Sequence, residues 1–295
     1  MQDKASVKYL FIINPGSGRQ SAEAWKTVIV DFFNGKTDDF EIYLLPEKLD
    51  TDEIREQISK KKPEHVVAVG GDGTVTMLAN ILSGTSIPLG IIPGGSANGM
   101  AKELGIPTDP KEALKIITAG FIKKCDLIRI NEKNCCLHMS DLGLNARLIK
   151  YFDEGKLRGK LGYAKVIIRA LWHSSKMYVS IRTKDTEIKR IAYMVVLANA
   201  RKYGTGAVIN PGGNPFDGLF EVIIVRKLSF RPLLKMLFRP GMFDPKHIEI
   251  IPCTSAVINT TRRFHFQLDG EYMGRINKVT AVISPGAVKL ILPAE

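Results

Sequence analysis

The sequence has no long apolar stretch, few cysteines and no acidic excess in its second part. None of its hydrophobic runs approaches the about 18 residues that a membrane-spanning helix needs, so no membrane span is expected. The first six residues lack an apolar signal core, and Gln2 stands where N-myristoylation needs glycine. The four cysteines show no CxxC spacing, which argues against a disulfide framework or a zinc site. These absences predict a cytoplasmic protein with reduced thiols.

Acidic residues are scarce in the second part of the chain. Residues 1–127 hold 15 Lys and Arg against 17 Asp and Glu, whereas residues 128–295 hold 27 against 13. This asymmetry points to an anionic partner for the second part, with a solvated basic surface as the alternative. That part also lacks an aromatic-rich stacking motif and a helix-turn-helix pattern, so no nucleic-acid partner is expected. An anionic membrane surface or a phosphate-bearing substrate fits better.

Strand-like and helix-like segments alternate along the first part. The expected strands are 8–14, 38–45, 65–69 and 87–92, and the expected helices are 21–35, 50–62, 74–82, 98–104 and 110–119. The last of these helices has a typical start, because Asp109 precedes Pro110 and Glu112 follows three residues after the cap. Strands that alternate with helices need crossover connections. The pattern therefore predicts an α/β unit with a mainly parallel sheet covered on both faces.

The second part changes character near residue 127. Most of its segments are short and alternate between apolar and polar residues, from CDLIRIN at 125–131 to VKLILP at 288–293. This alternation predicts an antiparallel, sandwich-like β unit. Two helical segments, roughly 147–172 and 229–238, interrupt it.

Three glycine-rich turns each follow an expected strand of the first part. They are NPGSG at 14–18, GGDGT at 70–74 and PGGSAN at 93–98. In an open parallel sheet such turns share the edge at the carboxyl ends of the strands, where α/β proteins bind ligands. Glycine lets backbone N–H groups approach a ligand, and helix N-termini favour anions, so a phosphate group is the expected ligand. No GK[ST] follows, so this is not a Walker A loop, and the first turn is not a GxGxxG dinucleotide motif.

These motifs resemble the diacylglycerol kinase catalytic-domain family, a lipid-kinase group that includes sphingosine kinases, ceramide kinases and soluble bacterial relatives. The resemblance rests on FIINPGSG (11–18), GGDGT (70–74), LGIIPGGSANGMAKELGIP (89–107), the glycine-rich segment at 198–225 and FQLDGEYMG (266–274). It implies an α/β nucleotide-binding domain at 1–127 and a β-rich lipid-substrate domain at 128–285, with the active cleft between them. It also implies that residues 286–295 return to the first domain.

The resemblance implies that the enzyme binds ATP on the glycine turns. The nucleotide-binding residues that it implies are Asn14, Ser17, Gly18, Gly70, Gly71, Gly73, Thr74, Gly95, Ser96 and Asn98. Asp72, within GGDGT, would lie closest to the phosphates and the metal. Phosphoryl transfer from ATP needs its charge neutralised, so Mg²⁺ is the expected cofactor.

The resemblance also assigns acidic residues of the second part. Glu271 in Asp269-Gly270-Glu271 is the candidate general base that would accept the proton of a lipid hydroxyl. Asp72 is the rival base, because sphingosine kinases use the aspartate of GGDG. Without the resemblance, the Asp-Gly-Glu motif indicates a hairpin turn.

A magnesium site is implied around Asp217, with Asn214 and the backbone of Leu219 beside it. Asp126 would join this site through water. An aspartate before a glycine is otherwise a common turn residue, so without the resemblance Asp217 indicates only a turn.

The chain departs from the family pattern at three positions. Gly99 replaces the aspartate that usually follows Asn98, Met77 stands where glutamate is common, and Asn145 stands where relatives often have aspartate. These departures leave open whether the activity is reduced or lost.

Two basic, apolar segments, 146–176 and 228–243, suit a peripheral contact with an anionic membrane that carries the lipid substrate. Packing of the same segments on the β unit is equally compatible with the pattern. The sequence does not name the lipid, and it leaves a homodimer open.

Two other functions remain alternatives. An NAD kinase shares the GGDGT loop and a β-rich second domain, although the segments at 93–107 and 269–271 argue against it. A catalytically silent regulator that binds nucleotide or lipid would explain the missing acidic groups.

Overall fold

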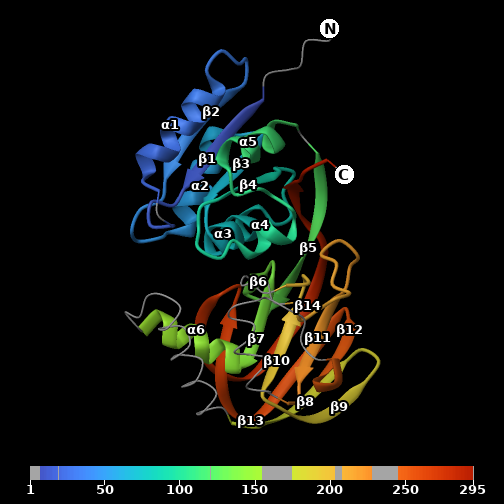
Figure 1. Ribbon diagram of the computed structural model, residues 1–295. Helices are drawn as coiled ribbons and strands as arrows, with labels where there is room; N and C mark the ends of the chain where they lie inside the picture. Colours follow the sequence, from blue (N-terminus) through green and yellow to red (C-terminus); the bar gives the residue numbers. More distant parts are fainter. Residues whose placement is uncertain are drawn as a thin grey trace. The chain divides into compact units, whose positions relative to one another are not determined.

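The computed structural model describes residues 7–18, 20–119, 121–154, 175–202, 208–227 and 245–294. The chain forms two compact units (Figure 1). Unit 1 comprises Met1–Cys125 and Gly286–Glu295, and unit 2 comprises Asp126–Pro285. Two strands, β5 (Ile122–Ile130) and β14 (Glu271–Ile291), contribute residues to both units.

Unit 1 contains the parallel sheet that the alternating pattern predicts. Its strands are β1 (Lys8–Ile13), β2 (Asp39–Leu44), β3 (His65–Gly70) and β4 (Leu89–Pro93), in the order β4-β3-β1-β2. Neighbouring strands are parallel throughout, and Leu290 of β14 extends the sheet beside Leu89 of β4. Strand β1 is fully buried from Leu10 to Ile13, as expected for a strand covered on both faces.

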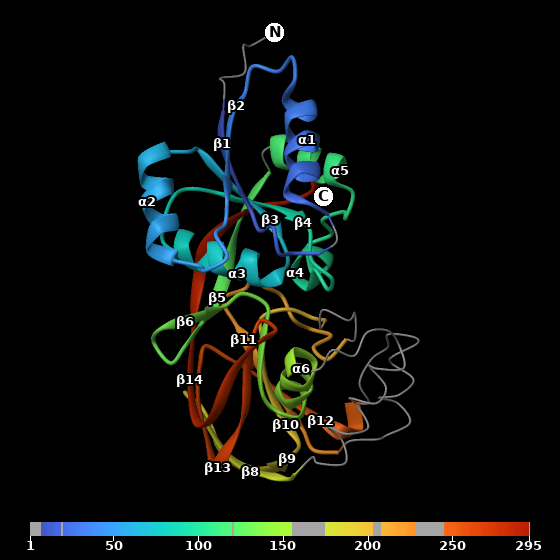
Figure 2. The same ribbon diagram turned by 90° about the vertical axis from the view of Figure 1, so that its left-hand side faces the viewer.

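Five helices accompany this sheet among the described residues of unit 1. They are α1 (Ala22–Phe33), α2 (Thr51–Lys61), α3 (Asp72–Leu82), α4 (Gly99–Glu103) and α5 (Pro110–Ala119). Helices α1 and α5 contact each other on one face, and α2 and α3 contact each other on the other face (Figure 2). Ser21 caps α1 and Asp50 caps α2 through side-chain acceptors, so these starts are encoded locally. The predicted α/β class is confirmed.

Unit 2 is built from antiparallel strands, as predicted. They are β6 (Asn134–Cys136), β7 (Met139–Gly143), β8 (Met177–Thr183), β9 (Glu187–Ala192), β10 (Met194–Ala198), β11 (Phe220–Val225), β12 (Ile248–Cys253) and β13 (Ser255–Leu268), with η1 (Pro245–His247) before β12. One layer has the order β12-β11-β10-β7-β13, and the other runs β9-β8-β13-β14-β5-β6. Strand β13 joins both layers because its register is interrupted between Asn259 and Phe264.

Apolar side chains of the two layers form the core of unit 2. Leu142, Leu197 and Phe220 come from one layer, and Ile181 and Ile258 come from the other. This interleaving of two inner faces is the packing of a β-sandwich.

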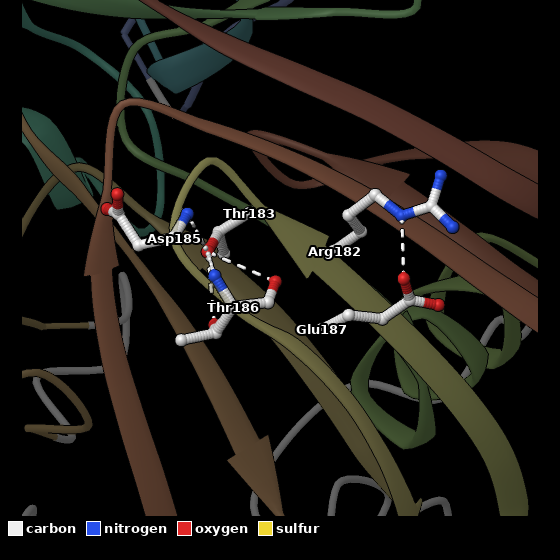
Figure 3. A network of polar contacts seen from close by, with 5 residues as sticks. All are labelled: Arg182, Thr183, Asp185, Thr186 and Glu187. Carbon is white, nitrogen blue, oxygen red and sulfur yellow. Dashed lines mark hydrogen bonds and ion pairs between the residues drawn. The ribbon is translucent and has the colours of Figure 1, made fainter.

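Polar contacts hold the edges of unit 2. Arg190 of β9 forms a bidentate ion pair with Glu249 of β12 at 2.8 and 2.9 Å, which links the edge strands of the two layers. Figure 3 shows the β8–β9 hairpin, where Arg182 pairs with Glu187 at 2.9 Å and Thr183 accepts N–H bonds from the turn. These contacts favour one register of the hairpin.

Helix α6 (Leu144–Glu154) begins three residues before the expected helix at 147–172 and packs against β7 and β13. The remainder of that expected helix and the helix expected at 229–238 lie outside the described residues. Among the residues that the structure describes, no helix is long and apolar enough to cross a membrane.

Candidate functional site

The three glycine loops of unit 1 leave the same edge of the sheet. Strands β1, β3 and β4 end at Ile13, Gly70 and Pro93, and the register pairs Ile13 with Val69 and Gly70 with Pro93. The first loop starts at the next residue, Asn14, and the other two start at the last strand residues, Gly70 and Pro93. The parallel arrangement therefore brings the loops together, although they are up to 80 residues apart in sequence.

The loops touch through glycine backbone. A Cβ on Gly95 would lie 2.5 Å from the Gly71 Cα, and a Cβ on Gly18 would lie 1.9 Å from the Gly94 carbonyl oxygen. Real Cβ atoms do not approach other atoms so closely, so these positions have no room for a side chain. Gly18 also has a φ of +75°, which an L side chain rarely adopts. The glycines are thus required by loop-to-loop contact as well as by any ligand.

Side chains tie the first loop to the second. The Asn14 Nδ2 donates to the Thr74 Oγ1 at 3.1 Å, and the Asn14 Oδ1 accepts the Gly16 N–H at 3.0 Å. The Ser17 hydroxyl donates to the Asn14 carbonyl at 3.0 Å. Asn14, Ser17 and Thr74 therefore have structural partners within the loops that were predicted to hold the nucleotide.

Asp72 holds the start of helix α4. Its Oδ2 accepts the Gly99 N–H at 2.9 Å, and its Oδ1 accepts the Met100 N–H at 3.1 Å. The Asn98 side chain closes the third loop on itself, because it bonds both the N–H and the carbonyl of Gly95. Asn98 adopts a left-handed φ of 50°.

The other predicted residues of this edge differ in exposure. Ser96 is exposed, Gly73 is half-buried and Gly70 is buried. Met77, one of the departures from the family pattern, lies half-buried on α3.

In unit 2, Asp269 and Gly270 form the tight turn between β13 and β14. Their φ values are 47° and 93°, as in a type I′ hairpin turn, and Leu268 pairs with Glu271 across it. Glu271 follows the turn and is exposed.

Asp269 points into unit 2 and is 7 % exposed. Its carboxylate accepts N–H bonds from Leu137, His138 and Met139 at 2.7–2.9 Å, and the Cys136 thiol donates to it at 3.1 Å. Burial and this carboxylate raise the pKa of the Cys136 thiol well above its usual range. The structure thus separates two neighbours that the motif presents together: Asp269 is an anchor, whereas Glu271 faces outward.

Three of the residues predicted around magnesium, Asn214, Asp217 and Leu219, lie in one loop of unit 2, and Asp126 contacts that loop. Asp126 on β5 is 3 % exposed, and its Oδ2 accepts the Gly218 N–H at 2.7 Å. Asn214 Oδ1 accepts the Phe216 N–H, and Asp217 Oδ1 accepts the Leu219 N–H at 3.0 Å. The loop therefore folds through side chains that were predicted as metal ligands.

The donor chemistry of this loop fits a hard cation. Two carboxylates, an amide oxygen and a backbone carbonyl supply only oxygen, which Mg²⁺ and Ca²⁺ prefer. The second oxygen of Asp217 has no partner among the described residues. Within that part of the chain, no group of three or more His, Cys, Asp or Glu side chains is arranged to hold a metal.

Sequence reasoning missed Glu221, a buried acid near this loop. It is 8 % exposed on β11, and the Asn210 amide donates to its carboxylate. Burial raises the pKa of Glu221 above its usual value, and the nearby Asp217 carboxylate adds to the rise. A glutamate inside the apolar run FEVIIV was the available signal.

The fold is an α/β unit joined to a β-sandwich, with three glycine loops at the sheet edge where α/β proteins bind ligands. Comparison with known families agrees: the diacylglycerol kinase catalytic domain matches residues 8–130, and the YegS C-terminal NAD kinase beta sandwich-like domain matches residues 139–292. The chain belongs to the diacylglycerol kinase catalytic-domain family of YegS-like lipid kinases.

Individual relatives are similar over most of their length. The probable lipid kinase YegS of Salmonella paratyphi A (strain ATCC 9150 / SARB42) is 30% identical over 258 residues, which cover 84% of this chain and 85% of that protein. The probable lipid kinase YegS of Escherichia fergusonii is 30% identical over 239 residues, or 78% of each chain. The crystal structure of a diacylglycerol kinase from Bacillus anthracis str. Sterne superimposes with a TM-score of 0.76 at 22% identity, covering 98% of both chains. At that identity the structural match supports the fold alone.

Proposed function

We propose that the protein is an ATP- and Mg²⁺-dependent lipid kinase that transfers the γ-phosphate to a hydroxyl of a membrane lipid. The observation that carries the proposal is the convergence of three glycine loops at one sheet edge in a member of a lipid-kinase family. A diacylglycerol-like or sphingoid lipid is the proposed acceptor class.

Helix α3 supports the assignment of this edge to ATP. Its N-cap is Gly71, and no side chain caps the helix there. The first N–H groups of a helix need acceptors, and phosphate oxygens are strong ones at a positive helix end. We therefore assign Gly71, Gly73 and Thr74 to the phosphates.

Glu271 is the proposed general base, because it is the glutamate of the Asp-Gly-Glu motif and its side chain is exposed. The other two candidates serve as anchors. Both oxygens of Asp72 accept N–H bonds from α4, and Asp269 accepts three backbone N–H bonds. The exposed carboxylate of Glu271 would accept the proton of the lipid hydroxyl as that oxygen attacks phosphorus.

Magnesium would be held on unit 2 by Asp217, with Asn214 and the Leu219 carbonyl beside it and Asp126 as a further acceptor. The bound ion would supply positive charge to this loop, and this charge would stabilise the conformation of the protein that binds the nucleotide. The oxygen-only donor set of this loop supports the assignment.

Phosphate transfer from γ-labelled ATP to lipids in mixed micelles with Mg²⁺ tests the proposal. Transfer to one lipid class is expected for the wild type, and Glu271→Gln should lower kcat by about 10²–10⁴-fold. Its Tm should not change, because surface substitutions stay within about 0.5 kcal/mol. Glu56→Gln, an exposed amide substitution on α2, is the matched control.

Asp269→Asn separates the anchor from the base. The asparagine NH₂ would face backbone N–H donors, so we expect the free energy of unfolding to fall by about 3 kcal/mol.

Transfer of the label to NAD, offered as a soluble acceptor in the same assay, would replace the lipid-kinase proposal with an NAD kinase. Bound ATP without transfer to any acceptor would favour a silent regulator.

A further inference from the structure

A buried polar contact lies directly behind the Asp-Gly-Glu turn. Asp141 on β7 and Gln267 on β13 are 0 % and 2 % exposed, and the Gln267 Nε2 donates to the Asp141 Oδ2 at 2.6 Å. The two residues are 126 positions apart in sequence. A short bond from an amide to a buried carboxylate is charge-assisted and stronger than a neutral one.

Gln267 connects this carboxylate to the turn. Its Oε1 accepts the Gly270 N–H at 2.8 Å, while its Nε2 also approaches the Met139 carbonyl at 3.4 Å. Gly270 is the residue immediately before Glu271. The amide therefore fixes the turn residue from which the proposed base extends.

Asp141 connects the same contact to helix α6. Its Oδ1 accepts the Ala146 N–H at 2.9 Å, and the Asn145 Nδ2 donates to its Oδ2 at 2.7 Å. Asp141 thus holds the first turn of α6 and orients Gln267 at once. Asn145, a departure from the family pattern, donates to this carboxylate, whereas an aspartate there would repel it.

Glutamine is the residue type that this position requires. Glutamate would still accept the Gly270 N–H but would lose the donor to Asp141 and would bring two carboxylates together. An apolar residue would leave the Gly270 N–H and one Asp141 oxygen without this partner. Such losses in a buried site are costly.

We propose that Asp141 and Gln267 are positioning residues that set the orientation of Glu271 through the Gly270 N–H. The inference rests on the proposed role of Glu271 as the general base. A base displaced by about 1 Å can lose about 10²-fold in rate, so the pair would control kcat without touching substrate.

The test exchanges donor and acceptor between the two residues. Gln267→Glu removes the donor, and Asp141→Asn in addition restores the bond, because one N–H of the new asparagine NH₂ faces the new carboxylate. The Asn145 amide, which donates to the same Asp141 oxygen in the wild type, must then turn so that its Oδ1 accepts the second N–H of this NH₂. The Oδ1 of the new asparagine can still accept the Ala146 N–H. Asn277→Asp, an exposed amide-to-acid change in the same hairpin, is the matched control.

We expect Gln267→Glu to lower kcat by about 10²-fold, with the KM for ATP unchanged and the acidic limb of the kcat–pH profile displaced. The double variant should recover kcat to within about tenfold of the wild type. If Gln267→Glu does not fold, the kcat of Gln267→Met is measured instead, because methionine removes the same hydrogen bonds without adding a charge.

The outcomes separate this inference from the proposed function. An inactive wild type would remove the proposed function itself, and a Glu271→Gln variant that retains full kcat would remove the base assignment on which this inference rests. An active wild type with an inactive Glu271→Gln, but wild-type kcat and pH profile in Gln267→Glu, would overturn the positioning role alone. The positioning role would also be overturned if the kcat of the double variant were no higher than that of Gln267→Glu.

Discussion

At the scale of single residues, the Asp-Gly-Glu motif did not predict which of its two carboxylates is buried. Asp269 and Glu271 are two residues apart, yet one carboxylate is buried among backbone donors and the other is exposed. The difference comes from the two-residue turn, because Asp269 lies in the turn with a left-handed φ whereas Glu271 is the first residue of β14. The donors to Asp269 come from residues 137–139, about 130 positions away, so local sequence does not reveal them.

Glu221 gives a prediction at this scale. Because the pKa of Glu221 is raised in the folded protein, the unfolded chain loses this proton first as pH rises. Stability therefore falls as pH rises from the usual carboxyl value of 4.5 to the raised pKa, and stays lower above it. Glu221→Gln removes this loss and keeps an acceptor for Asn210.

Thermal unfolding between pH 4 and pH 8 measures the effect. The variant should match the wild type at the acidic end and exceed it near neutrality, by roughly 2–4 °C for each kcal/mol. The Tm of Glu56→Gln, a substitution on the exposed face of α2, should change with pH in the same way as the Tm of the wild type. A difference between Glu221→Gln and wild type that does not grow with pH would contradict the assignment.

At the scale of elements, the sequence predicted much more. Alternating patterns and caps located strands β1 to β4 and helices α1 to α5 of unit 1, because propensity, periodicity and capping agree there. They assigned the segment of β5 to the second part, although β5 begins in unit 1. The shared edge of the three glycine loops also followed from strand order in parallel sheets. The contact between Gly71 and Gly95 could not be predicted, because it depends on the separation of β3 and β4 in the sheet.

This contact gives a prediction for the loops. Gly95→Ala places a Cβ against the Gly71 Cα, so the second and third loops must move apart. Overpacking of this kind costs about 1–3 kcal/mol, and we expect the affinity for Mg·ATP to fall about tenfold or more. Isothermal titration with a non-hydrolysable ATP analogue measures it.

Gly212→Ala is the control for this substitution. No atom lies within 4 Å of a Cβ at Gly212, so the alanine has open space there. Equal nucleotide affinity in both variants would show that the loop contact does not shape the binding site.

At the scale of the whole molecule, the charge is divided between the two parts of the chain. The excess of cations after residue 127 is compatible with an anionic membrane, the surface on which a lipid acceptor would be found. The two segments that first suggested this contact, 146–176 and 228–243, fall largely outside the described residues. Among the described residues, a group of exposed arginines remains on the β13–β14 hairpin.

This group comprises Arg262 and Arg263, at the irregular part of β13, and Arg275 of β14. All three are exposed, and the Arg275 Nη2 donates to the Arg263 carbonyl at 3.0 Å, so the three lie close together. Arg262 lies over the Phe264 ring at 5.1 Å, a contact worth about 0.5–1 kcal/mol at an exposed site. Replacement of these arginines therefore costs little stability.

We expect the double charge reversal Arg262→Glu/Arg263→Glu to weaken binding to anionic vesicles. Each cation near such a surface contributes about 1 kcal/mol, so the affinity should fall about tenfold or more at low salt, and the difference should shrink as salt is added. Sedimentation with phosphatidylserine-containing vesicles measures this. Lys48→Glu/Lys111→Glu makes the same charge change at exposed positions of unit 1. If both double variants lose affinity equally, net charge rather than this group attracts the membrane; if neither does, the described hairpin takes no part in binding.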